Sequence, residues 1–568
     1  MAQQRDWLLI LDNADDLALA AKYVPQGNRV QGHLLLTTRA ASGGTFAQII
    51  EVEKMDRDEG VLLLLRRAHL LAANAPLDRS AKRDRVDAEA IVDALDGLPL
   101  AIDQAGAYIE ETEITLSNYL KLYQTRRKDL LSLRGQLPPG HPETVGTTWD
   151  LSFQQVEHEN PAAANILRLC AFLAPDAIPE TIITEGASVL GEQLQAVATD
   201  PIKLNAAIKI LRQYSLIRRN RENNTLSLHR LVQAVLQDAM TQEEQGTWAE
   251  RAVRAVSEAL PWVDYGTWRD AQPYLSHADA CQFLIERFEL AFPEAASFLD
   301  AYGRYFYYTA QYEQAEPLFL RALAISETIE GSEHSNTATR LHELAQLYQA
   351  QGKYTQAEPL YQRALRISEQ ALGSDHPDTA ATLHQLAWLY QDQGLYTQAE
   401  PLYQRALRIY EQALGPDHSN TATTLHQLAW LYQDQGKYTQ AEPLYQHALR
   451  IKEQALGPDH PHTANTLHAL ASLYHNQGLY AQAEPLYLRA LHIHELMQGP
   501  DHPRTGETLH QLALLYHNQG LYAQAEPLYQ RALRIKERTL GPDHPSTIIT
   551  QQSYEALLQV MRQKRKNS

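Results

Sequence analysis

The stretch GKYTQAEPLYQRALRISEQALGSDHP, residues 352–377, decides the fold, because it recurs through the C-terminal half of the chain every 42 residues. Two markers keep this period in phase. A tyrosine after the turn recurs at Tyr312, Tyr354, Tyr396, Tyr438, Tyr480 and Tyr522, and a histidine recurs at His334, His376, His418, His460, His502 and His544. Self-similarity at a fixed period is typical of repeat architectures. The sequence therefore predicts about six copies of one unit.

Each unit is expected to form two amphipathic helices. In one copy Leu425, Leu428 and Tyr432 share a helical face, and Tyr445 and Ala448 share a face of the next helix. Such a pair cannot bury its apolar face alone, and stacking on neighbouring pairs buries it. We therefore predict a mainly α-helical protein whose C-terminal half is an α-solenoid.

The spacing of leucine, alanine and tyrosine in these units resembles the tetratricopeptide repeat. The 42-residue length, which exceeds the usual ~34, and the quoted stretch resemble the kinesin light chain subtype over residues 293–562. The light chains carry an Asn-Asn pair where this chain has His384 and Gln385. We therefore do not transfer the cargo peptides of kinesin to this chain as ligands.

The resemblance implies that the first helix of each repeat lines a concave groove that binds a peptide or protein. Aligning the copies places three rows of side chains on that face. The expected groove residues are His342, His384, Trp388, Gln391, His426, Trp430, Gln433, His468 and His510. Exposed tryptophans are costly unless they bind something, although passive duplication is an alternative explanation. We expect the imidazoles to be accessible and to titrate near ~6.5, and we expect them not to bind metal, because successive copies lie too far apart to share an ion.

The N-terminal half carries three runs that occur in a characteristic order. They are the apolar run from Trp7 to Leu11 followed by Asp12, the apolar run from His33 to Leu36 followed by Thr37, Thr38 and Arg39, and the run Gly97-Leu-Pro-Leu-Ala. This order resembles the NB-ARC class of signalling ATPases, the STAND group. The resemblance implies that Asp12 binds Mg²⁺, Arg39 senses the γ-phosphate and Pro99 faces the adenine of ADP or ATP.

A second segment extends this likeness. Residues 148–235 contain short helices, an apolar strand pair and the run SLHRLVQ, which resemble the winged-helix domain of the same family. The resemblance implies that His229 contacts the β-phosphate of ADP. The family usually has aspartate after this histidine, whereas this chain has Arg230. A histidine in the core is the alternative interpretation.

The phosphate-binding loop G-x-x-x-x-G-K-[ST] does not occur in the 568 residues. Its backbone N–H groups and lysine normally hold the phosphates, so we expect the sequence as given to bind ATP or ADP weakly at best and to hydrolyse neither. In the family, the strand before this loop lies between the other two strands. We therefore expect either that those two strands pair directly or, as the favoured alternative, that the polypeptide begins further upstream.

We accordingly predict five segments. They are a partial NB-ARC domain with a helical subdomain at 1–135, a winged-helix-like domain at 140–240, a helical connector at 241–292, the solenoid at 293–562 and a basic tail at 563–568.

The overall composition argues against some classes of partner. A formal charge of −18 argues against a nucleic-acid partner, and two cysteines with no long apolar run favour a cytoplasmic protein with no membrane partner. We find no catalytic constellation and predict a non-enzymatic signalling scaffold that binds a peptide or protein and could self-assemble. The alternative is a plain tetratricopeptide adaptor with a degenerate, nucleotide-free N-terminal region.

Overall fold

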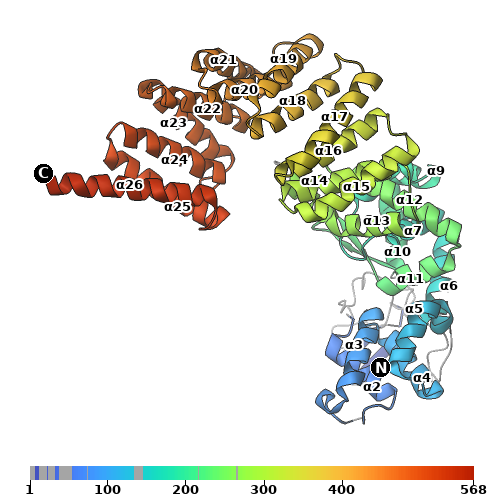
Figure 1. The fold of residues 1–568 in the computed structure, drawn as a ribbon. Helices are drawn as coiled ribbons and strands as arrows, with labels where there is room; N and C mark the ends of the chain where they lie inside the picture. The colour runs from blue at the N-terminus through green and yellow to red at the C-terminus, as the bar shows by residue number, and fades with distance from the viewer. Residues whose placement is uncertain are drawn as a thin grey trace. The chain divides into compact units, whose positions relative to one another are not determined.

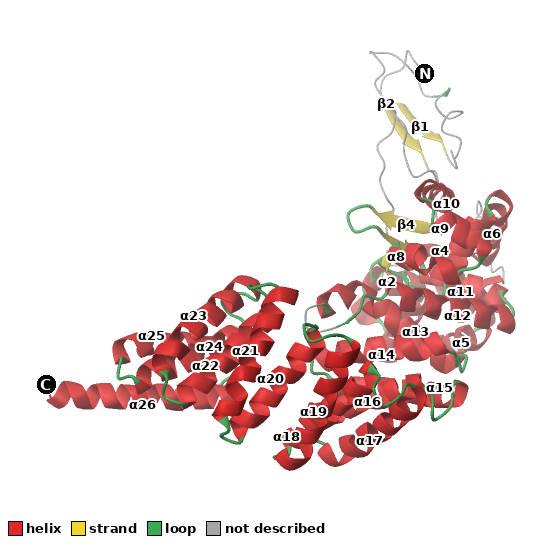
Figure 2. Cartoon of the chain, turned by 90° about the horizontal axis from the view of Figure 1, so that it is seen from above, coloured by secondary structure: helices red, strands yellow, loops and turns green. Residues whose placement is uncertain are grey.

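The computed structural model describes residues 7–11, 22–23, 32–36, 54–72, 74–132, 145–214, 216–263 and 267–567. Asp12 and Arg39, two of the expected nucleotide-binding residues, lie outside these ranges. The chain divides into two compact units, Met1–Ile325 and Ser326–Ser568, and each is considered by itself. Helices dominate both units, and the described strands belong to the first one (Figure 2).

The first unit begins with two short parallel strands, β1 (Trp7–Leu11) and β2 (Gly32–Leu36), which pair directly with Trp7 opposite Gly32. Direct pairing of these strands was one of the two expected alternatives. Leu8 and Ile10 are more than half exposed. Parallel sheets are usually covered on both faces, so this pair exposes more apolar surface than is common.

A group of helices follows, α2 (Arg57–Arg67), α3 (Lys82–Ala94), α4 (Pro99–Thr112) and α5 (Leu116–Ser132), with a short 3₁₀ turn at Leu77–Arg79. Their apolar faces meet in one core around Leu64, Ile91 and Ile102. Gly60 allows α2 to approach α3 closely, because a Cβ there would lie 2.7 Å from Val92 Cγ1. Leu231 of a later helix completes this core.

A second core gathers the rest of the first unit. Its elements are α6 (Val145–Glu159), α7 (Pro161–Cys170), β3 (Ile178–Pro179), α8 (Thr181–Glu185), the 3₁₀ turn η2 (Gly186–Val189), α9 (Glu192–Ala198), α10 (Pro201–Gln213), β4 (Ile217–Asn220), β5 (Thr225–Leu228), α11 (Arg230–Ala239), α12 (Gln242–Ala259), the 3₁₀ turn η3 (Trp268–Tyr274), α13 (Leu275–Arg287), α14 (Pro293–Tyr308) and α15 (Tyr312–Ile329). The strands form an antiparallel sheet in the order β3-β5-β4. Trp248 of α12 and Cys281 of α13 are buried in this core together with Leu167 of α7. The segment 241–292, expected to be a connector, therefore packs as part of a shared core.

The second unit consists of stacked helix pairs, as the period predicts. The helices are α16 (Ser335–Ala350), α17 (Tyr354–Ala371), α18 (Pro377–Asp392), α19 (Tyr396–Ala413), α20 (Ser419–Asp434), α21 (Tyr438–Ala455), α22 (Pro461–Asn476), α23 (Tyr480–Met497), α24 (Pro503–Asn518), α25 (Tyr522–Leu540) and α26 (Pro545–Asn567). Within this unit α19 and α21 lie along the outer edge of the curve, and α18 and α20 line its inner side (Figure 1). Helix α26 runs to Asn567, so the expected basic tail continues that helix.

The recurring histidine explains where each first helix begins. His376 is the N-cap of α18, and its Nδ1 accepts a hydrogen bond from the backbone N–H of Asp378 at 3.2 Å. Pro377 occupies the first turn, where its missing N–H costs nothing. Thr379 donates to the carbonyl of Gly373 at 2.9 Å, which fixes the preceding turn. The same cap recurs at His334, His418, His460, His502 and His544.

The solenoid core is built from the repeated tyrosines and alanines. One tyrosine in each second helix is almost completely buried, at Tyr361, Tyr403, Tyr445, Tyr487 and Tyr529. Tyr390 and Tyr432 of the first helices are each 8% exposed, as their place on the face between helices predicts. Small alanines such as Ala387 and Ala429 are fully buried and let the helices approach each other closely. The same packing therefore serves every junction between repeats.

Candidate functional site

The second unit contains a pocket of about 730 Å³ that spans repeats α18 to α24, and we call it the solenoid pocket. It is lined by Trp388, Ser419, Asn420, Thr423, His426, Gln427, Trp430, Gln433, Tyr445, Lys452, Leu456, His462, Asn465, His468, Ala469, Ser472, His494, Arg504, Glu507 and Thr508. Five of the expected groove residues are among them: Trp388, His426, Trp430, Gln433 and His468. His342, His384, Gln391 and His510 do not line this pocket.

Two tryptophans, Trp388 and Trp430, contribute aromatic surface to the pocket. Trp430 is 41% exposed, whereas Trp388 is half-buried against the repeat core. Each indole is hydrogen-bonded to an aspartate one turn further along its own helix, Asp434 for Trp430 and Asp392 for Trp388. Because an indole has a single donor, its ring face stays available for stacking.

The histidines that recur in the first helices are packing residues. His384 and His510 are 9% and 4% exposed. The ring of His384 meets the ring of Tyr403 edge-on, with centroids 5.3 Å apart. Its Nδ1 lies 3.2 Å from Thr424 Oγ1 of the next repeat. The same two contacts recur for His426 and His468, and the ring contact recurs for His342 and His510.

This packing overturns the expected titration near pH 6.5. Burial lowers the pKa of His384 to about 4, and burial likewise lowers the pKa of His468 and His510 to about 4. Burial also lowers the pKa of His342, and it holds the pKa of His426 well below 6.5. These imidazoles are therefore neutral at physiological pH.

The glutamine row also links repeats. Gln391 donates to Asp434 Oδ2 at 3.2 Å and accepts from the Tyr403 hydroxyl at 3.1 Å. Gln349 makes the same pair of contacts one repeat earlier, so these two are structural residues. One repeat later, the residue that would receive the amide of Gln433 is Asn476 instead of an aspartate. The buried Oε1 of Gln433 has no hydrogen-bond partner among the described residues.

Five charged or titratable residues of the pocket escaped the sequence analysis: Lys452, His462, His494, Arg504 and Glu507. Lys452 and His494 lie near the ends of the second helices α21 and α23. The sequence does carry a signal for them. The positions 42 residues apart read Ser368, Tyr410, Lys452, His494 and Lys536, a column that changes chemistry while its neighbours repeat.

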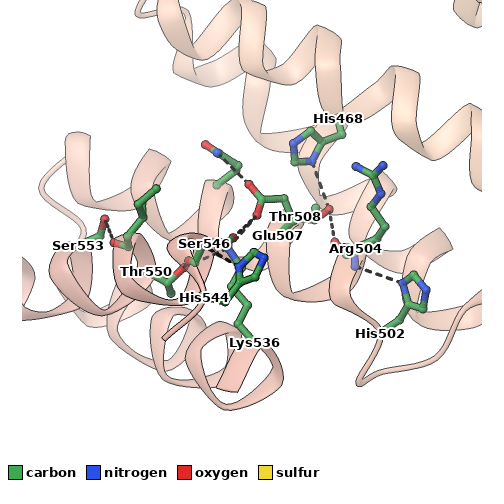
Figure 3. A network of polar contacts seen from close by, with 12 residues as sticks. His468, His502, Arg504, Glu507, Thr508, Lys536, His544, Ser546, Thr550 and Ser553 are labelled. Atoms are coloured by element: carbon green, nitrogen blue, oxygen red, sulfur yellow. Dashed lines mark hydrogen bonds and ion pairs between the residues drawn. The ribbon is translucent and has the colours of Figure 1, made fainter. Parts of the chain in front are cut away.

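One member of this column forms a buried ion pair. Lys536 is 2% exposed, and its Nζ donates to Glu507 Oε2 at 2.8 Å and to Thr550 Oγ1 at 3.0 Å (Figure 3). Burial alone would raise the pKa of Glu507, but attraction by Lys536 and the hydrogen bond from it lower that pKa to about 2. The carboxylate of Glu507 is therefore already paired with Lys536.

In the first unit, two of the expected nucleotide-binding features, His229 and the turn before Pro99, lie close together. His229 is the N-cap of α11, and its Nδ1 accepts from the N–H of Leu231 at 3.2 Å. Its Nε2 lies 3.5 Å from Asp96 Oδ2, and Lys54 Nζ lies 2.9 Å from Asp96 Oδ1. Burial lowers the pKa of His229, and its attraction to Asp96 opposes this effect.

The turn that contains Asp96 leads directly into α4. Gly97 has a φ of +69°, and a Cβ there would lie 2.6 Å from the carbonyl oxygen of Met55, so only glycine fits. Pro99 is the first residue of α4 and is exposed. His229 therefore lies beside the turn that positions Pro99.

Among the described residues, no group of three His, Cys, Asp or Glu side chains is arranged to hold a metal ion. In the same ranges no helix combines the length and the apolar character that a membrane span requires.

Comparison with known families identifies the repeats. Residues 294–564 match the tetratricopeptide repeat family in six overlapping segments, so this region of the chain belongs to that family. Residues 154–245 match a domain of unknown function, DUF7779.

A relative supplies a further likeness. The chain is 31% identical over 361 residues to a nucleotide-binding leucine-rich repeat (NLR)-like protein of Hyaloscypha variabilis. The match covers 58% of this chain and 34% of the relative, so the chain spans about a third of that protein's length. This relative fits the resemblance to nucleotide-binding signalling proteins.

Three solved structures are similar in part. BtubC (BKLC) of P. vanneervenii is 26% identical, with a TM-score of 0.36 over 42% of this chain and 93% of that chain. A kinesin light chain-type protein of Podospora anserina with nearly identical TPR-like repeats is 28% identical, with a TM-score of 0.32 over 37% and 99%. A STAND protein with a tetratricopeptide repeat sensor from Pyrococcus horikoshii is 14% identical, with a TM-score of 0.44 over 97% and 77%. We base no assignment on these superpositions, because their TM-scores are below 0.5.

Proposed function

We propose that the chain is a protein–protein interaction scaffold that binds an extended peptide, or an extended segment of a partner protein, in the solenoid pocket. Tetratricopeptide repeats supply the rigid frame, and the frame presents two indoles and a set of polar groups on the inner helices. The observation that carries the proposal is Trp430, a large aromatic side chain 41% exposed at the wall of a 730 Å³ pocket. Exposed aromatic anchors of this kind often dominate the energy of an interface.

The signalling part of the proposal concerns the first unit. We propose that it is an NB-ARC-type nucleotide switch of the STAND group, in which His229 and Pro99 face a bound ADP or ATP with Mg²⁺. The nearness of His229 to the turn before Pro99 supports this proposal. So does the order helix, strand, helices, strand, strand from α7 to β5, which is the order of a winged helix.

The residues present fit a nucleotide only in part. Lys54 and His229 supply positive or donor groups, but the carboxylate of Asp96 lies between them. The described residues include no phosphate-binding loop. A cytoplasmic location, self-assembly and the roles of Asp12 and Arg39 stay predictions. Equilibrium dialysis with labelled ADP tests the switch. We expect weak binding that His229→Ala abolishes, and no binding at all would favour the plain adaptor.

The pocket is tested by removing its anchors. Captures from a native cell extract should recover a partner with the wild-type chain and lose it with Trp388→Ala/Trp430→Ala. The matched control is Leu395→Ala/Leu479→Ala, because these leucines are 39% and 41% exposed but do not line the pocket. Binding of synthetic peptide pools to the immobilised chain gives the same comparison without the extract.

Stability measurements separate binding from folding. Trp430→Ala should cost less folding free energy than truncation of buried Tyr445, because the Trp430 side chain is 41% exposed, whereas loss of the Tyr445 ring should cost roughly 3–5 kcal/mol. If the tryptophan variant unfolds as early as Tyr445→Ala, or if it keeps every partner of the wild type, the proposal is wrong.

A further inference from the structure

The column of residues 42 apart in the second helices points into the space between repeats. Its members Ser368, Tyr410, Lys452, His494 and Lys536 are all buried, with exposed fractions between 1% and 6%. The last three each lie 3.0 Å from a threonine hydroxyl in the first helix of the next repeat. These residues therefore occupy the same position in each repeat, but the side chain at that position differs from one junction to the next.

Two members have a partner within their own repeat. Lys536 pairs with Glu507 at 2.8 Å, and His494 Nε2 lies 3.3 Å from Asn465 Oδ1. In both cases the partner is 29 residues earlier, on the first helix of the same repeat. The residue 29 positions earlier therefore determines whether the buried side chain has a partner within its own repeat.

Lys452 has no such partner. The residue 29 positions earlier is Thr423, whose hydroxyl donates to the carbonyl of Ser419 at 3.0 Å. Among the described residues, Lys452 Nζ makes one hydrogen bond, to Thr466 Oγ1 at 3.0 Å, and forms no ion pair. Burying an ammonium group without a counter-charge costs folding free energy. Removing one partner of a buried ion pair is strongly destabilising for the same reason. Lys452 therefore lacks the counter-charge that Glu507 supplies to Lys536.

The surroundings of Lys452 favour an anion. The solenoid pocket reaches Lys452 and Arg504, and Arg504 is exposed and forms no ion pair among the described residues. Glu507 is the carboxylate in the lining, and it is already engaged by Lys536. A chain with a net charge of −18 therefore has a pocket with uncompensated positive charge.

We propose that the solenoid pocket selects a peptide with a carboxylate, and that this carboxylate pairs with Lys452 in the place that Glu507 occupies beside Lys536. The inference deepens the proposed function and rests on it, because a peptide must enter the pocket first. It assigns a chemical class to the ligand. A Glu or Asp side chain and a free C-terminus are the two sources of that group.

The pH range in which binding should weaken follows from the pKa of Lys452. The charged and imidazole groups that line the pocket together with Lys452 are His426 of α20, His462 and His468 of α22, His494 of α23, and Arg504 and Glu507 of α24. Burial lowers the pKa of Lys452 to about 8. A paired carboxylate raises that pKa, so affinity should fall above pH 8 as the free protein loses the Lys452 proton.

The experiment uses synthetic twelve-residue peptide pools on the immobilised full chain. One pool has glutamate at a fixed central position and the other has glutamine, both with amidated C-termini, and a third glutamine pool has a free C-terminus. We expect the wild type to retain the glutamate pool at least about tenfold better than the amidated glutamine pool. Lys452→Met should abolish this preference, while Lys437→Met, an exposed lysine of the same repeat, should keep it.

A second variant addresses the possibility that Lys452→Met fails to fold. Thr423→Glu places a carboxylate beside Lys452, at the position equivalent to that of Glu507 beside Lys536. It should therefore also abolish the preference for the glutamate pool, and it should raise the melting temperature. Thr423→Gln is its control and should keep the preference. Thermal unfolding of all variants checks that they fold.

The outcomes separate the two proposals. Retention of the free C-terminus pool in place of the glutamate pool would identify the chain terminus as the source of the carboxylate. If the glutamate and glutamine pools bind the wild type equally and Trp388→Ala/Trp430→Ala removes both, the scaffold function stands and the Lys452 inference is wrong. If no pool binds, the proposed function itself is contradicted and the inference fails with it.

Discussion

At the scale of single residues, two repeats of the solenoid differ in whether a buried lysine has a counter-charge. Lys452 and Lys536 occupy equivalent positions, are buried to 6% and 2% exposure, and donate to equivalent threonines. They differ in the residue 29 positions earlier, Thr423 in one case and Glu507 in the other. One residue on the first helix thus decides whether a buried charge is compensated.

This difference predicts the effect of breaking the Lys536 pair. Glu507→Gln should lower the free energy of unfolding by about 1–3 kcal/mol, because it leaves the buried ammonium group of Lys536 without a counter-charge while the Glu507 side chain itself is 35% exposed. The double variant Glu507→Gln/Lys536→Met should recover most of that loss, since a buried ion pair is often replaced by apolar groups at little cost. Denaturant unfolding followed by circular dichroism measures both. Equal loss in the single and double variants would show that the pair is not the cause.

At the scale of the helix, each first helix of the second unit is started by a histidine instead of the more common serine, threonine or aspartate. The cap uses the neutral ring, because Nδ1 must accept the N–H two residues later. Threonine then ties the same turn to the glycine before it. Every junction in the solenoid therefore depends on an imidazole lone pair.

The cap can be tested at His376. Replacement by alanine should cost about 1 kcal/mol of stability, because the N–H of Asp378 loses its acceptor. Replacement by asparagine should cost much less, since its side-chain oxygen can accept the same hydrogen bond. Thermal melts of the two variants and the wild type compare them directly. Identical melting temperatures for alanine and asparagine would exclude a capping role.

The helices themselves could be predicted from the sequence, and several side-chain roles could not. The 42-residue period and the apolar faces gave the helix pairs and the burial of Tyr390 and Tyr432 correctly. The role of His384 was missed, because a polar residue on the inner face of a helix suggests exposure, while its partners Thr424 and Tyr403 lie on other helices. Lys452 was missed for the same reason, since its environment is formed across a junction.

At the scale of the whole molecule, the buried histidines couple the stability of the solenoid to pH. Burial lowers the pKa of His384, His468 and His510 to about 4 in the folded state, below the usual ~6.5 of an unfolded chain. The unfolded state therefore binds more protons between these values. Stability is fully present above pH ~6.5 and is lost as pH falls toward 4.

We expect the second unit to unfold more easily at pH 5 than at pH 7.5, by roughly 1–2 kcal/mol for each of these histidines. Denaturant unfolding at several pH values measures the slope. His468→Gln should flatten the pH dependence in proportion to the one histidine removed. A stability that stays constant from pH 7.5 to 5 would contradict the neutral, buried state of these rings.

The contacts that join the repeats also set how the solenoid could change in length. The hydrogen bond from His384 to Thr424 reaches 40 residues along the chain, and the ion pair from Arg405 to Glu369 reaches 36. Neither contact extends past the adjacent repeat. Excision of residues 396–437 would bring His384 opposite Thr466, which has the same side chain as Thr424. The solenoid is therefore modular, because these contacts at each junction involve only the two repeats that meet there.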